Sequence, residues 1–318
     1  MLLRLDSAAP VPCAAGAVAD SATTLAVVNR SAGGGRGAKL EPALRAALSG
    51  TQPGTRVVVS ADAAAAIAAV ATLPRGSRVV IVGGDGTLHG LLSALIAGDH
   101  AAALLPVGSG NDTARALGVL RLPWRDALQH ALTAPVGVID TGVVRTEHEQ
   151  QPFVSSVCVG LDAAIARRAR GRLRVLGSAP RYLLAALIEL LRLRRHRLRV
   201  DADGRTIHDG DALLCAVLNT PSYGGGLPMQ PRATVADGQL DAVVAGGVGR
   251  GAALALLLEL LRARHLDDPR VRHTGFESLR VEAGAALPLA ADGEPLVDAR
   301  RIDIEVRAQS LRVVGLWH

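Results

Sequence analysis

The stretch Val79-Val80-Ile81-Val82-Gly83-Gly84-Asp85-Gly86-Thr87-Leu88 decides the fold class of this chain. It opens with four β-branched apolar residues, which predict a short strand buried on both faces, as in a parallel sheet. The three glycines that follow allow the backbone to turn tightly and to approach a ligand closely. Asp85 stands at the carboxyl end of the predicted strand, where open α/β sheets bind their ligands. We therefore expect this turn to belong to a binding site.

The same pattern, an apolar run followed by small and polar residues, recurs on both sides of this stretch. The further predicted strands and the polar segments after them are 25–28 with 29–37, 56–59 with Ser60, and 103–106 with 107–112. Predicted helices lie between the strands, over residues 42–48, 62–71, 88–97 and 113–117. This alternation is typical of a parallel α/β sheet. A glycine-rich turn after a strand can cradle phosphate with its N–H groups, although a flexible loop would explain the glycines of 29–37 as well.

After Pro123 the pattern changes from alternating helices and strands to a β-rich one. A helix over 124–132 is followed by predicted strands at 137–145, 153–159, 197–201, 212–219, 240–244, 279–282 and 302–306. Two arginine-rich helices, 180–195 and 250–264, interrupt them. This pattern favours a second, mostly antiparallel domain of β-sandwich-like type, with the boundary between about residues 120 and 137.

Composition narrows the functional classes. Of the 318 residues, 49% are hydrophobic and only 2% aromatic, so few side chains are available for base stacking. We therefore expect no nucleic-acid partner, despite a net charge of +6. Cys13, Cys158 and Cys215 lack metal-ligand spacing, which indicates unpaired thiols in a reducing compartment. Residues 1–22 are expected to be a flexible tail rather than a signal peptide, and no apolar stretch is long enough to span a bilayer, so a cytoplasmic protein is expected.

Three blocks in a fixed order resemble the diacylglycerol kinase catalytic-domain family, which includes bacterial lipid kinases and sphingosine and ceramide kinases. They are Gly-Gly-Asp-Gly-Thr at 83–87, Pro-Val-Gly-Ser-Gly-Asn-Asp at 106–112 and Leu-Ala-Ala-Asp-Gly-Glu-Pro-Leu at 289–296. Segments 29–33, 157–163, 181–183 and 236–241 are also similar to blocks of that family. The resemblance extends over residues 23–318, and the three blocks together are far more specific than any one of them.

The resemblance implies an ATP-dependent kinase that phosphorylates a lipid hydroxyl of the diacylglycerol or sphingoid kind. It implies an ATP-binding domain over 23–134, an acceptor-binding domain over 135–318 whose last strand returns to the first domain, and an active site in the cleft between them. By position, the residues around ATP would be Asn29, Arg30, Ser31, Ala32, Gly33, Ser60, Gly84, Asp85, Gly86, Thr87, Leu88, His89, Gly90, Leu91, Ser109, Asn111 and Asp112.

The resemblance also implies catalytic roles for three carboxylates. Asp85 would act on the Mg²⁺–phosphate assembly, while Asp292 and Glu294 would hold the acceptor, one of them taking the hydroxyl proton. Which of the two is the base stays open, and a solvated Asp-Gly hairpin turn would explain the same residues. Phosphoryl transfer needs charge neutralisation and a group that orients the attacking hydroxyl, which agrees with these roles.

A second, structural Mg²⁺ is implied near residues 236–241. Its ligands here would be the Asp237 carboxylate with the carbonyl groups of Thr234 and Gln239. One carboxylate with carbonyl groups is a weak ligand set for Mg²⁺, and a turn without metal explains these residues equally well.

The chain departs from the family pattern next to its central turn. His89-Gly90 stands where the family usually has Asn-Glu, Arg30 where it usually has proline, and Thr113 where phenylalanine is common. The missing glutamate keeps open a homologue that binds nucleotide or lipid but is catalytically impaired. A dinucleotide kinase related to NAD kinase, which shares the Gly-Gly-Asp-Gly-Thr turn, is the other alternative.

Arginine placement suggests where a lipid kinase could meet its acceptor. One arginine cluster comprises Arg167, Arg168, Arg170, Arg172, Arg174 and Arg181, and another comprises Arg192, Arg194, Arg195, Arg197 and Arg199. The leucines of the helix between them share one face, which predicts either a peripheral contact with the inner membrane surface or a helix that faces the core. Exposed edge strands leave a homodimer open as well.

Overall fold

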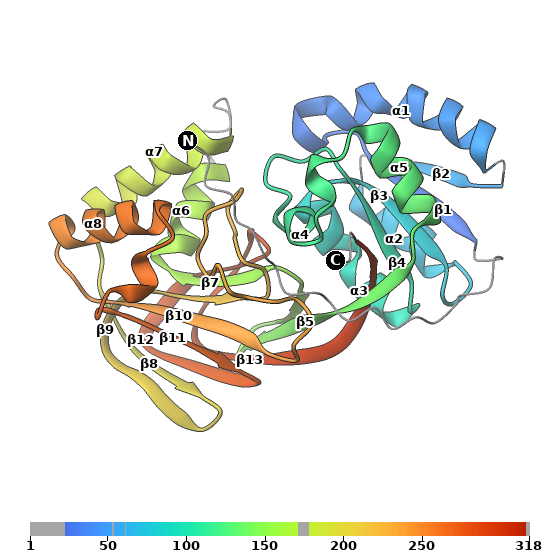
Figure 1. The fold of residues 1–318 in the computed structure, drawn as a ribbon. Coiled ribbons are helices and arrows are strands. Elements are labelled where there is room, and N and C mark those ends of the chain that lie inside the picture. The colour runs from blue at the N-terminus through green and yellow to red at the C-terminus, as the bar shows by residue number, and fades with distance from the viewer. Residues whose placement is uncertain (1–22, 53, 61, 171–177, 316–318) are drawn as a thin grey trace.

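The computed structural model describes residues 23–315 apart from 53, 61 and 171–177, and the side chains of 178–183 are also outside the description. The predicted tail, Cys13, Arg172 and Arg174 therefore lie outside the described residues, as does the side chain of Arg181. The fold has two parts, an N-terminal α/β part and a C-terminal part dominated by antiparallel strands (Figure 1). The predicted fold class is confirmed.

The N-terminal part is built on four parallel strands in the order β4-β3-β1-β2. These are β1 Thr24–Asn29, β2 Arg56–Ser60, β3 Arg78–Gly83 and β4 Ala101–Pro106. Alternate residues of each strand enter two different clusters. Val79 and Ile81 pack against α2 Ala63–Ala71 and α3 Asp85–Ala97, whereas Val80 and Val82 pack against α1 Ala32–Thr51 and α5 Trp124–Thr133. Burial on both faces explains why these strands are continuous apolar runs.

The C-terminal part is a set of antiparallel strands covered on one side by helices. Its strands are β5 Val136–Thr146, β6 Gln150–Phe153, β7 Ser156–Gly160, β8 His196–Ala202, β9 Arg205–Leu218, β10 Leu240–Gly246, β11 Val271–Phe276, β12 Ser278–Ala291 and β13 Glu294–Val314. The helices are α6 Leu161–Arg170, α7 Ser178–Leu191 and α8 Arg250–Leu261, which lie side by side in Figure 1. None of the described helices combines the length and the apolar character needed to span a bilayer.

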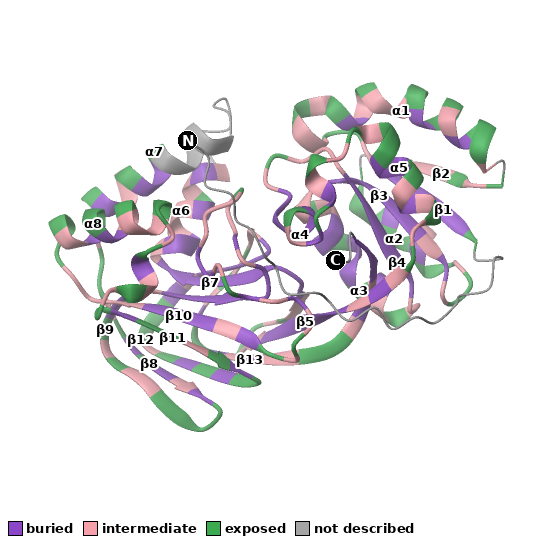
Figure 2. Cartoon of the chain, viewed as in Figure 1, coloured by how far each residue is buried: buried purple, intermediate pink, exposed green. Residues whose placement is uncertain are grey.

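The last strand joins the two parts. β13 pairs antiparallel with β12 and β5, and its end pairs parallel with β4, where Val313 lies opposite Ala102 and Val314 opposite Ala103. Leu311 and Val313 consequently belong to the core of the N-terminal part. Figure 2 shows this stretch of β13 buried where it reaches the N-terminal sheet.

Several sequence-based boundaries differ from the structure: the expected helix 180–195 ends at Leu191, and the expected strands 212–219 and 302–306 correspond to parts of the longer strands β9 and β13. The expected strand 153–159 is interrupted after Phe153, because the next backbone N–H groups donate to the carboxylate of Asp292 instead of a neighbouring strand. The expected strand 279–282 is part of β12, which has 14 residues. In the first half of β12 exposed and buried residues alternate. The helix α6 and the strand β11 were not predicted.

Candidate functional site

The carboxyl ends of the four parallel strands lie at one edge of the sheet. In the strand register Asn29 lies opposite Ser60, and Gly83 lies opposite Pro106. The turns that follow these strands therefore meet at one place, although they are up to about eighty positions apart in the sequence. The convergence of the polar turns at the sheet edge follows from the parallel pairing.

Glycines allow these turns to touch. A Cβ on Gly108 would lie 2.6 Å from the Cα of Gly84 and 2.5 Å from Oδ1 of Asn111, so only glycine fits between them. In the first turn Gly33, Gly34 and Gly35 have φ values of +60°, +69° and +94°, a region that glycine adopts readily. Arg36, just after this turn, donates to the carbonyl of Gly108 at 2.7 Å. Backbone groups of both turns are thereby held close together around the start of α3.

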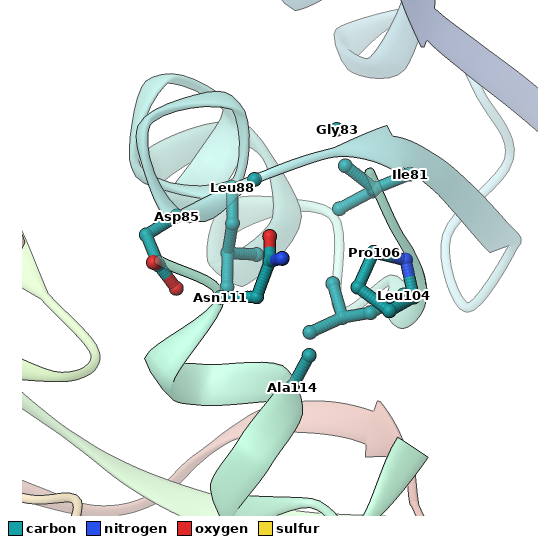
Figure 3. A pocket seen from close by; sticks show the side chains of 9 residues that line it. Ile81, Gly83, Asp85, Leu88, Leu104, Pro106, Asn111 and Ala114 are labelled. Carbon is teal, nitrogen blue, oxygen red and sulfur yellow. The ribbon is translucent and has the colours of Figure 1, made fainter. Parts of the chain in front are cut away.

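Asp85 is the first residue of α3 and reaches across to the next turn. Its carboxylate accepts hydrogen bonds from the backbone N–H of Asp112 at 3.1 Å and of Thr113 at 3.2 Å. Figure 3 shows this carboxylate directed toward the turn that carries Asn111. Burial raises the pKa of Asp85, and the two backbone hydrogen bonds oppose that shift.

Asp112 places a second carboxylate beside Asp85. It is 5% exposed and accepts hydrogen bonds from the backbone N–H of Gly225 at 2.9 Å and from the Ser222 hydroxyl at 3.3 Å. Burial, followed by the negative charge of Asp85, raises the pKa of Asp112 to about 6. The Oδ2 atoms of both aspartates lie within 4 Å of the position of a Cβ on Gly110. A cation would stabilise these two like charges, of which Asp112 is buried and Asp85 half-buried.

A small cavity lies beneath the central turn. Its walls are Ile81, Gly83, Gly84, Asp85, Leu88, Leu104, Pro106, Asn111 and Ala114 (Figure 3). Asn111 adopts a left-handed backbone with φ of +56° and donates its amide to the carbonyl of Gly108 at 2.8 Å. Its buried Oδ1 has no hydrogen-bond partner among the described residues. An unpaired buried acceptor at this turn can receive a donor from a ligand or a water molecule.

The turn between β12 and β13 brings the second part of the molecule to this edge. Asp292 and Gly293 form a two-residue hairpin loop with φ values of +49° and +78°, as the Asp-Gly pair predicts. The Asp292 side chain nevertheless has no exposed surface. Its oxygens accept hydrogen bonds from the backbone N–H groups of Val154, Ser155 and Ser156, with a shortest distance of 2.7 Å. The hairpin loop is therefore anchored inside the molecule rather than solvated.

His89 completes the surroundings of Asp292. Its Nδ1 lies 2.9 Å from Oδ2 of Asp292, and its Nε2 lies 3.1 Å from the side-chain amide of Gln151. Burial alone would lower the pKa of His89, but the hydrogen bond to Asp292 and its negative charge outweigh burial and raise that pKa. The residue that departs from the family pattern thus connects α3 directly to the hairpin of the second part.

Glu294 lies at the start of α3. Its two oxygens pair with both terminal nitrogens of Arg170 on α6, each at 2.5 Å. A Cβ on Gly86 would lie 2.6 Å from Oε1 of Glu294, so the carboxylate sits against the first turn of α3, next to Asp85 in the sequence. About a third of the Glu294 side chain is exposed, whereas Asp292 is enclosed.

The other sequence-predicted residues differ in their contacts and burial. Asn29 donates to the Thr87 hydroxyl at 2.9 Å and accepts from Ser31, which joins the first turn to α3. Arg30 and Ser109 are exposed beside these turns, and Ser60 lies at the end of β2 with its hydroxyl on the Asp62 backbone. Leu88 and Leu91 are core side chains, so only their backbone could face a ligand. The remaining members, Ala32 and Gly90, are half-buried and exposed respectively.

The predicted second metal site is a turn that closes on itself. One oxygen of Asp237 accepts from the Thr234 hydroxyl at 2.6 Å and the other from the backbone N–H of Gln239 at 3.0 Å. Among the described residues no group of three His, Cys, Asp or Glu side chains could hold a metal ion. The hydrogen bonds of this turn are satisfied by the protein alone, so Mg²⁺ here stays a prediction that the donor set does not favour.

Sequence reasoning did not assign several members of the site. Arg170 appeared only as part of a basic cluster, and Gln151 and the backbone of 154–156 not at all. Arg170 pairs with Glu294, Gln151 contacts His89, and the backbone of 154–156 donates to Asp292. The partners in these contacts lie between 62 and 138 positions apart in the sequence. No local motif marks them, because they depend on how the hairpin loop docks against α3.

Comparison with known proteins agrees with this architecture. Residues 23–144 match the model of the diacylglycerol kinase catalytic domain, and residues 155–315 match that of the YegS C-terminal NAD kinase beta sandwich-like domain. This chain belongs to the diacylglycerol kinase family of lipid kinases. The resemblance to this family is confirmed over both parts of the chain, and membership of a kinase family supports a phosphotransferase.

Individual family members have moderate sequence identity. A diacylglycerol kinase of Mycobacterium tuberculosis is 30% identical over 240 residues, which cover 74% of this chain and 77% of that protein. A probable lipid kinase YegS-like protein of Shewanella frigidimarina is 26% identical over 242 residues, 74% of this chain and 76% of that protein. A solved protein of Bacillus anthracis, proposed to be a diacylglycerol kinase, superposes with a TM-score of 0.73 at 19% identity, covering 92% of this chain and 97% of that one.

Proposed function

We propose that this family member is an ATP-dependent lipid kinase, which transfers the γ-phosphate of ATP to the hydroxyl of a diacylglycerol-like or sphingoid-like lipid. The single observation that carries this proposal is that three carboxylates, contributed by both parts of the molecule, meet near the start of α3. Asp85 and Asp112 come from the phosphate-binding edge of the α/β part, and Glu294 comes from the hairpin of the other part. A donor site and an acceptor site are thereby adjacent, as an in-line transfer requires.

The turns of the α/β part suit a nucleotide triphosphate. The turns at 33–37 and 107–110 meet beside the site, where the Arg36 side chain bridges the carbonyl groups of Gly33 and Gly108 and supplies positive charge. Asp85 and Asp112 would hold Mg²⁺, because this ion commonly uses one or two carboxylates together with substrate phosphates. When bound, the ion would neutralise phosphate charge. Burial and the charge of Asp85 raise the pKa of Asp112, and a cation bound here would oppose that shift.

The two carboxylates of the hairpin have different tasks in this proposal. Every oxygen of Asp292 already accepts hydrogen bonds inside the protein, so Asp292 positions the hairpin and His89. Glu294 is partly exposed and is the proposed base. As the lipid oxygen bonds to the γ-phosphorus, its proton passes to Glu294, and the bond from phosphorus to the β–γ bridging oxygen breaks to release ADP. Arg170, now paired with Glu294, would turn to the transferred phosphate.

The proposal is tested with labelled ATP and a panel of lipids, with the product identified by mass. We expect a phosphorylated lipid from the wild type and at least a hundredfold lower turnover from Asp85→Asn and Glu294→Gln, since each removes a charge needed in the transition state. Asp126→Asn, an exposed residue of α5 in the same part, is the matched control. A phosphorylated dinucleotide without lipid product would identify the dinucleotide kinase instead, and ATP binding without any transfer would identify an impaired homologue.

A further inference from the structure

The outer faces of α7 and α8 carry the most exposed apolar side chains of the helices in the described chain. The residues are Leu184, Leu187 and Leu191 on α7, with exposures of 38%, 47% and 64%, and Leu254, Leu258 and Leu261 on α8, with exposures of 46%, 46% and 50%. Their spacing of three and four positions places each trio on one side of its helix. A row of six leucines facing solvent is unusual for a surface without a partner.

The two helices form one continuous surface. Leu190 of α7 and Ala253 of α8 are buried in the same small cluster with Leu213 of β9. Both helices therefore pack on the sheet through this cluster, and the side of each helix away from it is exposed. The Arg250 side chain donates to the backbone carbonyl of Leu191 at 3.0 Å, which ties the end of α7 to the start of α8. Figure 1 shows α7 and α8 side by side, and Figure 2 shows exposed residues along both.

Basic residues surround these leucines. Exposed arginines follow the end of α7 and lie at both ends of α8, namely Arg192, Arg194, Arg195, Arg250, Arg262 and Arg264. Glu259 pairs with Arg262 and Arg264, and Glu189 is paired with Arg168 of α6. In the described part of the chain no carboxylate forms an ion pair with Arg192, Arg194 or Arg195. The surface thus has an apolar centre and a positively charged margin.

We propose that this surface, Leu184, Leu187, Leu191, Leu254, Leu258 and Leu261 with its arginine margin, docks the protein on an anionic lipid bilayer. Leucines buried at the headgroup boundary and arginines against lipid phosphates are the pattern of an interfacial amphipathic surface. A second copy of the chain fits less well, because a two-fold interface would bring the same arginines close to one another. The surface is coupled to the site through α6, whose Arg168 pairs with Glu189 of α7 and whose Arg170 pairs with Glu294.

The biological role of this docking surface rests on the proposed lipid kinase function. The docking itself is measured without ATP, so the measurement does not depend on that function. Full-length protein is sedimented with vesicles of phosphatidylglycerol and of phosphatidylcholine at low and high salt. We expect salt-sensitive binding to phosphatidylglycerol vesicles only. Leu187→Gln with Leu258→Gln should weaken that binding at least tenfold, and Arg194→Gln with Arg195→Gln about thirtyfold, since each arginine near an anionic surface contributes about fivefold. Ile67→Gln and Arg75→Gln, exposed residues of the α/β part, are the matched controls.

Each result decides the question. Phosphorylation of a short-chain, detergent-dispersed lipid should be unchanged in the leucine and arginine variants, so a failure of docking and a failure of the kinase proposal are distinguishable. The proposal is overturned by any of these results: no binding to anionic vesicles, equal binding by the variants, or a wild-type dimer that the leucine variants convert to a monomer. Binding that appears only after deletion of residues 1–22 would assign the surface to the chain's own N-terminal segment, which also overturns it.

Discussion

At the scale of single residues, the site depends on buried charges that lie close to one another. Asp85 and Asp112 share one approach, and burial with mutual repulsion raises the pKa of Asp112 to about 6. Asp292 has the opposite situation, because three backbone N–H groups and His89 surround its carboxylate. A cation would stabilise the Asp85–Asp112 pair, whereas Asp292 holds the hairpin loop in place.

The Asp112 carboxylate predicts how metal activation depends on pH. Below about pH 6 the proton competes with Mg²⁺ for this group, so the apparent Mg²⁺ affinity should weaken about tenfold per pH unit. Mg²⁺ activation curves at fixed ATP between pH 5 and 8 measure this dependence. Asp112→Asn should remove it and bind Mg²⁺ more weakly at every pH. The exposed variant Asp126→Asn shows how much of the pH dependence comes from the protonation of ATP itself. If the apparent Mg²⁺ affinity of the wild type and of Asp112→Asn changed equally with pH, Asp112 would not be the ligand that the proton competes for.

His89 predicts a pH-dependent part of stability. Because its pKa in the folded protein is raised above 6.5, protonated His89 stabilises the fold fully below that value, and this contribution is lost as pH rises through the folded pKa. Between pH 5.5 and pH 8.5 the wild type should lose unfolding free energy that His89→Gln does not lose, because only the charged form of His89 has the charge-assisted hydrogen bond to Asp292. Urea unfolding measures this. His148→Gln, an exposed histidine, should follow the wild type, and identical curves for all three proteins would refute the pairing.

At the scale of elements, the site consists of turns that approach one another at the carboxyl edge of the parallel sheet. The strands align the turns, and glycines allow backbone contact between them. A helix then begins at Asp85 and another at Asp112, and the first N–H groups of the second helix donate to the Asp85 carboxylate. The arrangement is rigid because each turn is held by the next one, as in the contact of Arg36 with Gly108.

The contact of Gly84 with Gly108 predicts the effect of a single methyl group. In Gly108→Ala the new Cβ would lie 2.6 Å from the Cα of Gly84, which pushes the two turns apart. We expect at least a tenfold loss of ATP affinity by calorimetry, with a small loss of thermal stability. Gly50→Ala on α1, where a Cβ meets no atom within 4 Å, should bind ATP as the wild type does. Unchanged binding by Gly108→Ala would separate these turns from the nucleotide site.

At the scale of the whole molecule, β13 connects the two parts through hydrogen bonds and shared core. It runs from the hairpin of the site at Glu294 to the N-terminal sheet at Val314. The same strand therefore positions the acceptor-side carboxylate and completes the parallel sheet. Motion of one part relative to the other must bend β13 and β5 or change the contact of His89 with Asp292.

The connection predicts that a change near the C-terminus destabilises the N-terminal sheet. Leu311 is 1% exposed and packs in the cluster of Leu25, Val79 and Ile81. Leu311→Ala should lower the unfolding free energy by about 2–5 kcal/mol, the usual cost of a cavity at a buried leucine. Hydrogen exchange of the β4 amides at 101–106 should accelerate accordingly. Val297→Ala in the exposed start of β13 is the control, and protection of β4 in Leu311→Ala equal to the wild type would exclude this coupling.

The sequence alone determined the local elements, the two-part architecture and the central turns. Apolar runs such as 79–82 reveal a strand buried on both faces, and glycines after a strand reveal a close backbone approach, because both depend on short-range geometry. The central turn at 83–87 was identified in this way, and its Asp85 does contact the next turn. The interruption of 153–159 was missed, since its cause is a carboxylate 138 positions away.

Only the tertiary structure decided which side chains meet at that turn. His89 was a departure from a family pattern in the sequence, and docking of the hairpin made it the partner of Asp292, 203 positions away. Docking also enclosed Asp292, left Glu294 partly exposed against Arg170, and turned six leucines of α7 and α8 outward. These outcomes depend on the packing of elements that are distant in the sequence, which residue types and spacing do not encode.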